Sequence, residues 1–447
     1  MTYSPQNRAL PGGPPKAART LSGSRARTAL SALAVTALTT SLLTTSLLAA
    51  SPVANSAAGS PLASGTTAAG LGAPDLRQAV AGRSPITPAA RAEIDRVVGE
   101  GLDNSARITA ARGTKAASTD VLARALIRCA TFEEQRYCLG LGWTQADATQ
   151  AAGRIASAAR SARLLARGAK APETTGDLDA AALLDQRAAL TPKQRARVER
   201  RELRQAAASI AKIWLLRHQI QGMALPKDFL ADHPEVRVPA TALGRGGGEV
   251  KDPVKTAADY PDQGHVLSEE HVNDQRQTYW CGPTTMQMIA WTKKSPMRTQ
   301  RYWAKRLRTT TSGTNITDMV RVINNKTDWD KPGRAGTYVV LDISDLAYGQ
   351  WTLLIRRHIW DYRAPMVFHP ILLKEFYPYL DDDASGHYQV GRGYDNNPDG
   401  PTKVSFFEPW NQQRFDPSEP FIERVQLRSA YKSYRANQEH FLHNMGV

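Results

Sequence analysis

Apolar residues recur at helical spacing through much of residues 75–242. In the run from Thr191 to Gly222, the apolar positions between Val198 and Leu216 fall close to a 3.6-residue period. Helix-start signals, either a capping side chain or a proline in the first turn, occur at Thr87-Pro88, Ser118-Thr119-Asp120, Thr144 and Thr191-Pro192. The pattern predicts an all-α, Ala- and Arg-rich N-terminal region over residues 75–242.

Glycine and proline interrupt both the helical and the strand period between residues 243 and 261. We interpret this stretch as a linker and residues 262–447 as a separate domain, which holds seven of the nine tryptophans. Periodicity there predicts helices near 281–293, 298–308, 315–325, 345–360 and 423–445, and strands near 337–343, 365–369, 387–394 and 403–408. Helices followed by an antiparallel sheet indicate an α+β domain.

The first 74 residues carry a targeting pattern. Five basic residues and no acidic residue are accompanied by the apolar run from Thr28 to Ser51, which is the layout of a secretory signal peptide. We expect residues 1–57 to hold the signal and its cleavage region, residues 58–74 to be flexible, and the mature protein to be secreted or cell-wall associated. An uncleaved membrane anchor is the alternative, because an apolar run of about 20 residues can span a bilayer.

Composition changes this picture little. With 42% hydrophobic and 22% charged residues, the chain can bury a core. Its formal net charge is +15, and the basic cluster Arg195–Arg204 adds to it. Acidic residues are interspersed there, so we expect a solvated helix face and no nucleic-acid partner. An anionic cell-wall surface is the second interpretation of this cluster.

The three cysteines divide into a pair and a single residue. Cys129 and Cys138 lie nine residues apart, which suits a small disulfide loop in an exported protein, and Cys281 is then left as a free thiol. Three buried free thiols are the alternative interpretation.

The segment Gln275 to Met286 (QRQTYWCGPTTM) is the most informative about chemistry. Gly282-Pro283 suits the first turn of a helix, which puts Cys281 at a helix N-terminus. The helix dipole and the unpaired N–H groups there favour the thiolate, the nucleophilic form of cysteine. A cysteine enzyme also needs a base, a group that orients the base, and donors for an oxyanion.

Three motifs together supply such groups. Gln275 stands six residues before Cys281-Gly282-Pro283, Ser385-Gly386-His387 opens an apolar strand, and Glu408-Pro409 ends a later one. This pattern, over roughly residues 260–412, resembles the bacteriocin-processing (double-glycine leader) peptidase-like branch of the papain-like cysteine peptidases. The resemblance implies a papain-like fold with Cys281 as nucleophile, His387 as general base, Glu408 as its orienting group and Gln275 as oxyanion donor.

The chain departs from that family pattern in two places. The last strand of the family usually ends in Asp-Pro or Asn-Pro rather than in Glu408-Pro409. Arg392 interrupts a strand that is normally apolar, and we expect it to face solvent at a sheet edge. A hairpin centred on Pro398 sets His387 opposite position 409, and one residue of slack in the turn brings it opposite Glu408. Asp395 lies about 26 Å away along the same strand, so we predict that Glu408 orients the imidazole. Gln277 competes with Gln275 as the oxyanion donor.

No other chemistry has a comparable pattern. The sequence contains no HExxH and no paired CxxC, and neither His265/His271 nor His440/His443 has the flanking ligands of a zinc site. We therefore expect no metal and no organic cofactor, and a peptide or protein as the substrate. Membrane association is expected only if the N-terminal segment stays uncleaved.

These observations predict a secreted cysteine peptidase-like hydrolase that cleaves peptide or other amide bonds through a thioester. Two alternatives are a non-catalytic cell-wall or protein-binding module that retains the fold, and a thioester acyl transferase. The role of residues 75–242 stays open among a pro-region that covers the groove, a binding module and a structural partner. Gly246-Gly247-Gly248 in the linker is a candidate site of self-processing.

Overall fold

The structure is a computed structural model, and it describes residues 76–114, 118–167, 174–238, 255–291, 297–377, 380, 383–396, 403–410, 425–429 and 444–447. These residues belong to one compact unit, Ala68–Val447. The predicted signal and flexible segments, residues 1–74, lie outside the described residues, as do the linker residues 243–254. No helix in the described ranges has the length and apolar character needed to cross a membrane.

Helices dominate the region before residue 238. They are α1 (Pro88–Asp103), α2 (Ser105–Arg112), α3 (Ser118–Leu126), α4 (Ala148–Leu165), α5 (Ala180–Ala189), α6 (Pro192–Ala207), α7 (Ile210–Gln221) and α8 (Phe229–Asp232). Thr87 and Thr191 cap α1 and α6 with their side chains, as predicted. The capping box of α4 is made by Asp147 with Gln150, so this helix begins after Asp147 rather than near Thr144.

The prediction of an all-α N-terminal region is wrong at residues 129–143. The chain forms β2 (Cys129–Phe132), β3 (Gln135–Cys138) and β4 (Gly142–Trp143) there. Glu133 and Glu134 both have positive φ, 42° and 64°, which is the geometry of a two-residue hairpin turn. Glutamate is uncommon in such a turn, so the sequence carried no hairpin signal. The predicted disulfide is confirmed, because Cys129 bonds to Cys138 across this hairpin.

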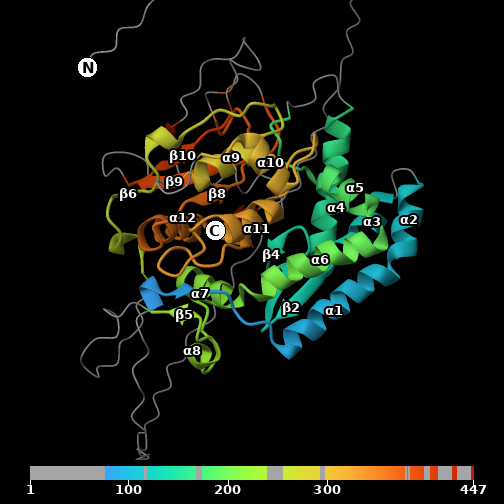
Figure 1. Ribbon diagram of the computed structural model, residues 1–447, viewed down its shortest axis with the longest axis horizontal. Helices are drawn as coiled ribbons and strands as arrows, with labels where there is room; N and C mark the ends of the chain where they lie inside the picture. Colours follow the sequence, from blue (N-terminus) through green and yellow to red (C-terminus); the bar gives the residue numbers. More distant parts are fainter. Residues whose placement is uncertain are drawn as a thin grey trace, which may run out of the picture. The chain divides into compact units, whose positions relative to one another are not determined.

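Ten strands of the described residues form one mixed sheet, and most of their pairs are antiparallel. Figure 1 shows its neighbouring strands β10, β9 and β8. The order is β11-β10-β9-β8-β12-β7-β4-β3-β2, with β6 paired to β9. The strands not yet given are β6 (Gln263–His265), β7 (Val340–Asp342), β8 (Met366–Phe368), β9 (Gln389–Asp395), β10 (Lys403–Phe407), β11 (Val425–Ser429) and β12 (Asn444–Gly446). A separate two-stranded sheet pairs β1 (Val80–Ala81) with β5 (Val236–Arg237). The mixture of helices with a largely antiparallel sheet agrees with the predicted α+β class.

The second half of the chain follows the predicted order up to its last element. Its helices are α9 (Cys281–Ala290), α10 (Gln300–Leu307), α11 (Ile316–Lys326) and α12 (Tyr348–Arg356), which continues into a π-helical turn. The helix predicted over 423–445 is wrong at residues 425–429 and 444–445, because β11 pairs with β10 and β12 pairs with β7 and β8. Residues 430–443 of this prediction lie outside the described residues. Apolar and polar residues alternate in Val425–Ser429, and this period of two suits a strand with a distant partner.

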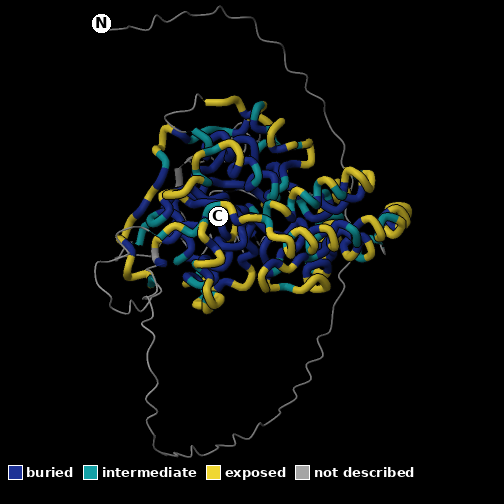
Figure 2. The backbone as a smooth tube through the Cα atoms, turned by 60° about the horizontal axis from the view of Figure 1, so that its bottom comes forward, coloured by how far each residue is buried: buried dark blue, intermediate teal, exposed yellow. Residues whose placement is uncertain are grey.

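One hydrophobic core contains residues from both sides of the predicted linker. Trp214 of α7 belongs to the same buried cluster as Leu341 of β7 and Trp351 of α12. Lys212, also on α7, is buried and donates from Nζ to the carbonyl of Ala335 at 2.8 Å. Figure 2 shows buried residues running through the centre of the compact part, with exposed residues at its periphery. A boundary within 243–261 stays a prediction, although the residues on its two sides pack into one core.

Candidate active site

Cys281 is the first residue of α9, as predicted, and it is fully buried. The close packing of this helix start requires the next residue to be glycine, because a Cβ on Gly282 would lie 2.5 Å from Oγ1 of Thr314. At a helix N-terminus the first N–H groups have no partner within the helix. The N–H of Cys281 donates instead to the carbonyl oxygen of Thr175 at 3.2 Å.

The environment of the Cys281 thiol disfavours its ionisation. Burial raises the pKa of the thiol well above its ordinary value, and the negative charges of Asp177 and Glu408 act in the same direction. The N–H of Gly282, at the helix N-terminus, and the N–H of Tyr388, next to β9, lower this pKa, but burial outweighs them. The expectation of a stabilised thiolate is therefore corrected, and the neutral thiol is the favoured form in this arrangement.

His387 and Glu408 are in direct contact and are fully buried. Nε2 of His387 lies 2.6 Å from Oε1 of Glu408. The backbone N–H of Tyr388, the residue after His387, contacts the Cys281 thiol, so the thiol lies in the same site as the His387–Glu408 pair. Nδ1 of His387 is buried without a hydrogen-bond partner in the described part of the chain, so the thiol and the imidazole are not hydrogen-bonded. Nε2 of the imidazole is thus held by a carboxylate, and Nδ1 makes no hydrogen bond to the described residues.

The carboxylate of Glu408 is held by several donors. Oε1 accepts the N–H of Trp410 at 2.9 Å, and Oε2 accepts Nε2 of Gln389 at 2.7 Å. Burial alone would raise the pKa of Glu408, but the charge of His387 and these hydrogen bonds lower it below its ordinary 4.5. The carboxylate is therefore ionised at neutral pH and can balance a positive charge on the imidazole.

The pairing of β9 with β10 differs from the predicted register. The register shifts after Ser405 at a bulge, and Phe407 then pairs with Val390. Extending this pairing by one residue sets Glu408 beside Gln389 rather than opposite His387. Because residues two apart point to the same face of a strand, Gln389 and His387 both face the carboxylate. The longer side chain of glutamate, compared with aspartate, suits this diagonal approach.

Arg392 is the extra residue at the bulge, and it does not face solvent as predicted. It is 6% exposed, and its guanidinium donates to the carbonyl of Leu267 at 3.0 Å. The same group lies 4.9 Å from the ring centre of Phe407, in a cation–π arrangement. The bulge therefore lets a charged residue within the strand find partners inside the fold.

Gln275 lies in the site, whereas the competing Gln277 is exposed. Nε2 of Gln275 donates to three carbonyl oxygens, those of Thr278 at 2.8 Å, Gln277 at 3.0 Å and Thr175 at 3.2 Å. Its backbone N–H donates to the carbonyl of Pro409 at 2.8 Å, which ties it to the residue after Glu408. Among these two glutamines, the geometry favours Gln275 as an oxyanion donor.

A segment that the sequence did not indicate crosses the site. Residues 174–179 lie between α4 and α5, and the carbonyl oxygen of Thr175 accepts both the Cys281 N–H and Nε2 of Gln275. Gly176 has φ 109°, and a Cβ there would lie 2.3 Å from the carbonyl carbon of Tyr279. The sequence Thr-Thr-Gly-Asp signals only a local turn, so this contact with a distant helix start had no local pattern from which to be predicted.

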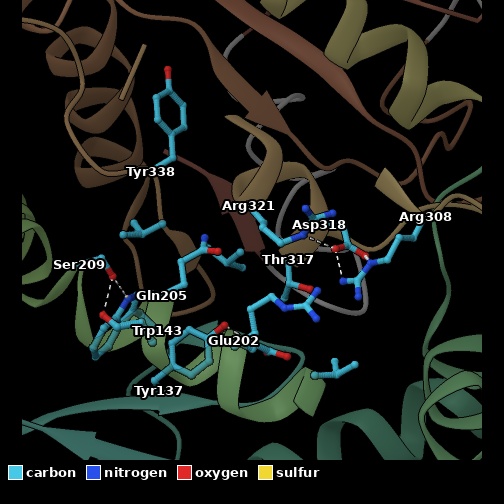
Figure 3. Close-up of a pocket in the computed structure, with 15 residues that line it drawn as sticks. Tyr137, Trp143, Glu202, Gln205, Ser209, Arg308, Thr317, Asp318, Arg321 and Tyr338 are labelled. Carbon is cyan, nitrogen blue, oxygen red and sulfur yellow. Dashed lines mark hydrogen bonds and ion pairs between the residues drawn. The ribbon is translucent and has the colours of Figure 1, made fainter. Parts of the chain in front are cut away.

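A polar pocket elsewhere in the structure contains none of the predicted site residues (Figure 3). Residues from α6, α11 and β7 line it, and its volume is about 30 Å³, which suits about one water molecule. Its carboxylate, Asp318, is already paired with Arg308 and Arg321. No group of three His, Cys, Asp or Glu side chains within the described ranges could hold a metal ion.

Comparison with known families supports a peptidase. Residues 269–438 match the model of the Peptidase_C39 like family, and this segment contains Gln275, Cys281, His387 and Glu408. The match supports a papain-like cysteine peptidase of this type, and a peptidase acts on a peptide or protein substrate. It covers less than half of the chain and leaves residues 76–268 without a match. Searches among curated proteins and among solved structures found no match.

Proposed function

We propose that this protein is an exported cysteine peptidase that hydrolyses peptide or other amide bonds through a thioester on Cys281. The observation that carries the proposal is the buried contact of 2.6 Å between Nε2 of His387 and Oε1 of Glu408. This pair lies beside the buried thiol, in the segment that matches the peptidase family. A carboxylate–imidazole pair next to a thiol is the arrangement that nucleophilic cysteine catalysis needs.

In the proposed mechanism, Sγ of Cys281 attacks the substrate carbonyl carbon and its proton passes to Nδ1 of His387. Glu408 holds Nε2 and stabilises the imidazolium that forms. The N–H of Cys281 and Nε2 of Gln275 stabilise the oxyanion, and their two bonds of 3.2 Å to a single carbonyl oxygen support that role. The amine leaves with the proton from His387, and water then hydrolyses the thioester and restores the thiol.

The raised pKa of Cys281 affects the order of the steps. A thiol that is neutral at rest must give up its proton as it attacks, so His387 acts as a general base rather than as the partner of a permanent ion pair. Entry of a substrate carbonyl would bring Sγ and Nδ1 into the geometry that the resting site lacks.

A non-catalytic binding module is the second candidate. It is favoured by the full burial of Cys281 and by the occupied oxyanion donors, since both leave the resting site without access for a substrate. Hydrolysis that depends on Cys281 separates the two candidates.

The test compares the wild-type chain, Gly176→Ala and Gly176→Ala/Cys281→Ala on a mixture of peptides, with products read by mass spectrometry. We expect the Gly176→Ala change to open the site, because the added methyl group cannot fit against Tyr279 while residues 174–179 cross it. We expect new peptide termini from Gly176→Ala and none from the double variant. Products that carry an added amine would indicate acyl transfer. Equal product patterns with and without Cys281 would contradict a cysteine enzyme.

Export is a further part of the proposal. The signal-like segment 1–57 and the disulfide between Cys129 and Cys138 support it, because disulfides persist in oxidising compartments. Fractionation of expressing cells should find the chain, without its first residues, in the medium or on the cell wall. A full-length chain in the membrane fraction would indicate the uncleaved anchor, and a reduced chain in the cytosol would contradict export.

A further inference from the structure

We propose that the segment Thr175–Leu178 is a built-in inhibitor that occupies the substrate groove, so that the folded protein is latent until this segment is displaced. The proposal rests on the proposed function, because it takes Cys281 and its neighbours as the peptidase site. The groove binds an extended peptide, and its occupant in this structure is the protein's own chain.

The first support is the position of the Thr175 carbonyl. Its oxygen accepts the N–H of Cys281 and Nε2 of Gln275, each at 3.2 Å. These are the two donors that the proposed mechanism assigns to the oxyanion. A substrate carbonyl cannot reach them while Thr175 is in place, and Cys281 has no exposed surface.

The second support is the way the segment is bound on both sides. Thr175 donates from its N–H to Oγ of Ser385 at 3.0 Å and from Oγ1 to the carbonyl of Gly386 at 2.7 Å. On the other side, the carbonyl of Gly176 accepts the N–H of Thr314 at 2.9 Å, and the N–H of Leu178 donates to the carbonyl of Thr314 at 3.0 Å. A segment held on both sides mainly through its backbone, here between Ser385–Gly386 and Thr314, resembles a recurrent mode of peptide recognition.

The third support is a buried anchor beside the backbone contacts. Asp177 is 4% exposed, and its Oδ1 lies 2.8 Å from Nε2 of His369, which is fully buried. The His369 ring stacks on Tyr388 with ring centres 4.6 Å apart. The negative charge of Asp177 also raises the pKa of the Cys281 thiol. The segment therefore both fills the groove and holds the nucleophile in its unreactive form.

The fit is close enough to exclude a side chain at the crossing point. A Cβ at Gly176 would meet the carbonyl carbon of Tyr279 at 2.3 Å, and a Cβ at Gly313 would meet the carbonyl oxygen of Gly176 at 2.4 Å. Gly176 and Gly313 thus let the segment pass close to the backbone beside Cys281. The β-type pairing of the segment is one isolated bridge, Asp177 to Thr314, and the segment belongs to none of the strands of the sheet. Its release leaves the sheet intact, as a displaceable inhibitor requires.

The test measures the rate at which iodoacetamide labels Cys281 in the wild-type chain, in Gly176→Ala and in Gly333→Ala. Cys281 is the free thiol of this chain, so whole-protein mass reports its labelling directly. Gly333 is the matched control, because it also has positive φ, 85°, while a Cβ there would meet nothing within 4 Å. A buried thiol is labelled only when the structure around it opens.

We expect Gly176→Ala to be labelled about ten- to a hundredfold faster than the wild-type chain, since overpacking of this kind strongly disfavours the closed form. Gly333→Ala should match the wild type. Equal rates for Gly176→Ala and wild type, or rapid labelling of the wild type itself, would overturn the proposal. Labelling does not require turnover, so faster labelling without peptide hydrolysis would support the covering segment and count against the proposed peptidase activity.

A second variant covers the case in which Gly176→Ala does not fold. Asp177→Ala adds no atoms and removes the anchor at His369. Because it also changes the charge near the thiol, its readout is hydrogen exchange at the N–H of Leu178, which should speed up together with labelling of Cys281. Unchanged exchange at Leu178 would contradict a displaceable segment. Intact mass distinguishes an inhibitor from a substrate, because Cys281-dependent cleavage between Thr175 and Gly176 would overturn inhibition.

Discussion

Glu408 combines full burial with donors from His387, Gln389 and the Trp410 backbone. Replacing one carboxylate oxygen by an NH₂ group would set a donor against one of these donors, which costs about 1–3 kcal/mol. It would also remove the charge that stabilises an imidazolium. Both effects make Glu408 the residue whose substitution is most informative about the roles within the site.

Glu408→Gln in the Gly176→Ala background should therefore lower kcat/KM for peptide hydrolysis by about 10²- to 10⁴-fold. Asp395→Asn is the matched control, because Asp395 pairs with Lys403 and Gln263 at the far end of β9. It should leave kcat/KM within about twofold of the parent. Steady-state kinetics with one peptide substrate gives the ranking, and the reverse ranking would remove Glu408 from its proposed role.

The lowered pKa of Glu408 makes the stability of the fold depend on pH. A carboxyl group with a depressed folded-state pKa contributes its full stabilisation above the unfolded-state value, near 4.5, and loses it as the pH falls through the folded-state value. The difference in free energy of unfolding between wild type and Glu408→Gln should thus be largest at neutral pH and shrink below about pH 4.5. Urea unfolding across this range measures it, and a difference that does not vary with pH would contradict the assignment.

For individual residues, the sequence was informative where the spacing of residues along the chain indicates the site. Gln275 and Cys281 lie in one short segment, and His387 and Glu408 stand at the ends of neighbouring strands, so pattern alone could bring them together. The contacts of Thr175 and Asp177 with the helix start at Cys281 could not be predicted, because these two residues lie far away along the chain. Nothing local in those two residues indicates a partner about a hundred residues away.

Among the elements, the β2–β3 hairpin shows how a disulfide can be predicted without its secondary structure. The spacing of Cys129 and Cys138 indicated the bond, but Glu133 and Glu134 gave no turn signal. The last strands, β11 and β12, were hidden for a related reason: each is short and gains its stability from a distant partner. Long amphipathic helices such as α6 and α11 were predictable, because their apolar stripe and caps are local.

The hairpin makes a prediction of its own. The disulfide closes a loop of nine residues, and removing it with Cys129→Ala/Cys138→Ala should lower the free energy of unfolding by about 2.5 kcal/mol. Urea unfolding measures the loss. A reducing agent should bring the wild-type chain to the stability of this variant and leave the variant itself unchanged. A reductant effect on the variant would show that the loss does not come from this bond.

In the whole molecule, the helical region and the peptidase-like segment share one sheet and one core. Trp143 of β4 pairs with Leu341 of β7, and Arg154 of α4 contacts the buried Asp342 at 2.9 Å. The same Asp342 accepts Oγ1 of Thr144 at 2.6 Å. Removing the N-terminal region would leave Asp342 without Arg154 and Thr144. It would also expose the core residues that pack with α7, such as Leu341 and Trp351.

Residues 262–447 alone should consequently fail to fold into a cooperative unit, whereas residues 75–447 should unfold at the same urea concentration as the mature protein. Circular dichroism during urea unfolding distinguishes the two chains. A sharp transition from the isolated 262–447 fragment would show that it is an independent domain, as its composition first indicated.

The most direct measurement of whether Cys281 and His387 form one catalytic unit is the reaction of the opened chain with a peptide epoxide. Such a probe alkylates a thiol that is activated within a peptidase site, and peptide mapping identifies the modified residue. Gly176→Ala should be modified at Cys281, and Gly176→Ala/His387→Ala should react at least about tenfold more slowly, because the base that removes the thiol proton is missing. Modification at equal rates in the two variants, or no modification of Cys281 while iodoacetamide labels it readily, would contradict a catalytic role for this pair.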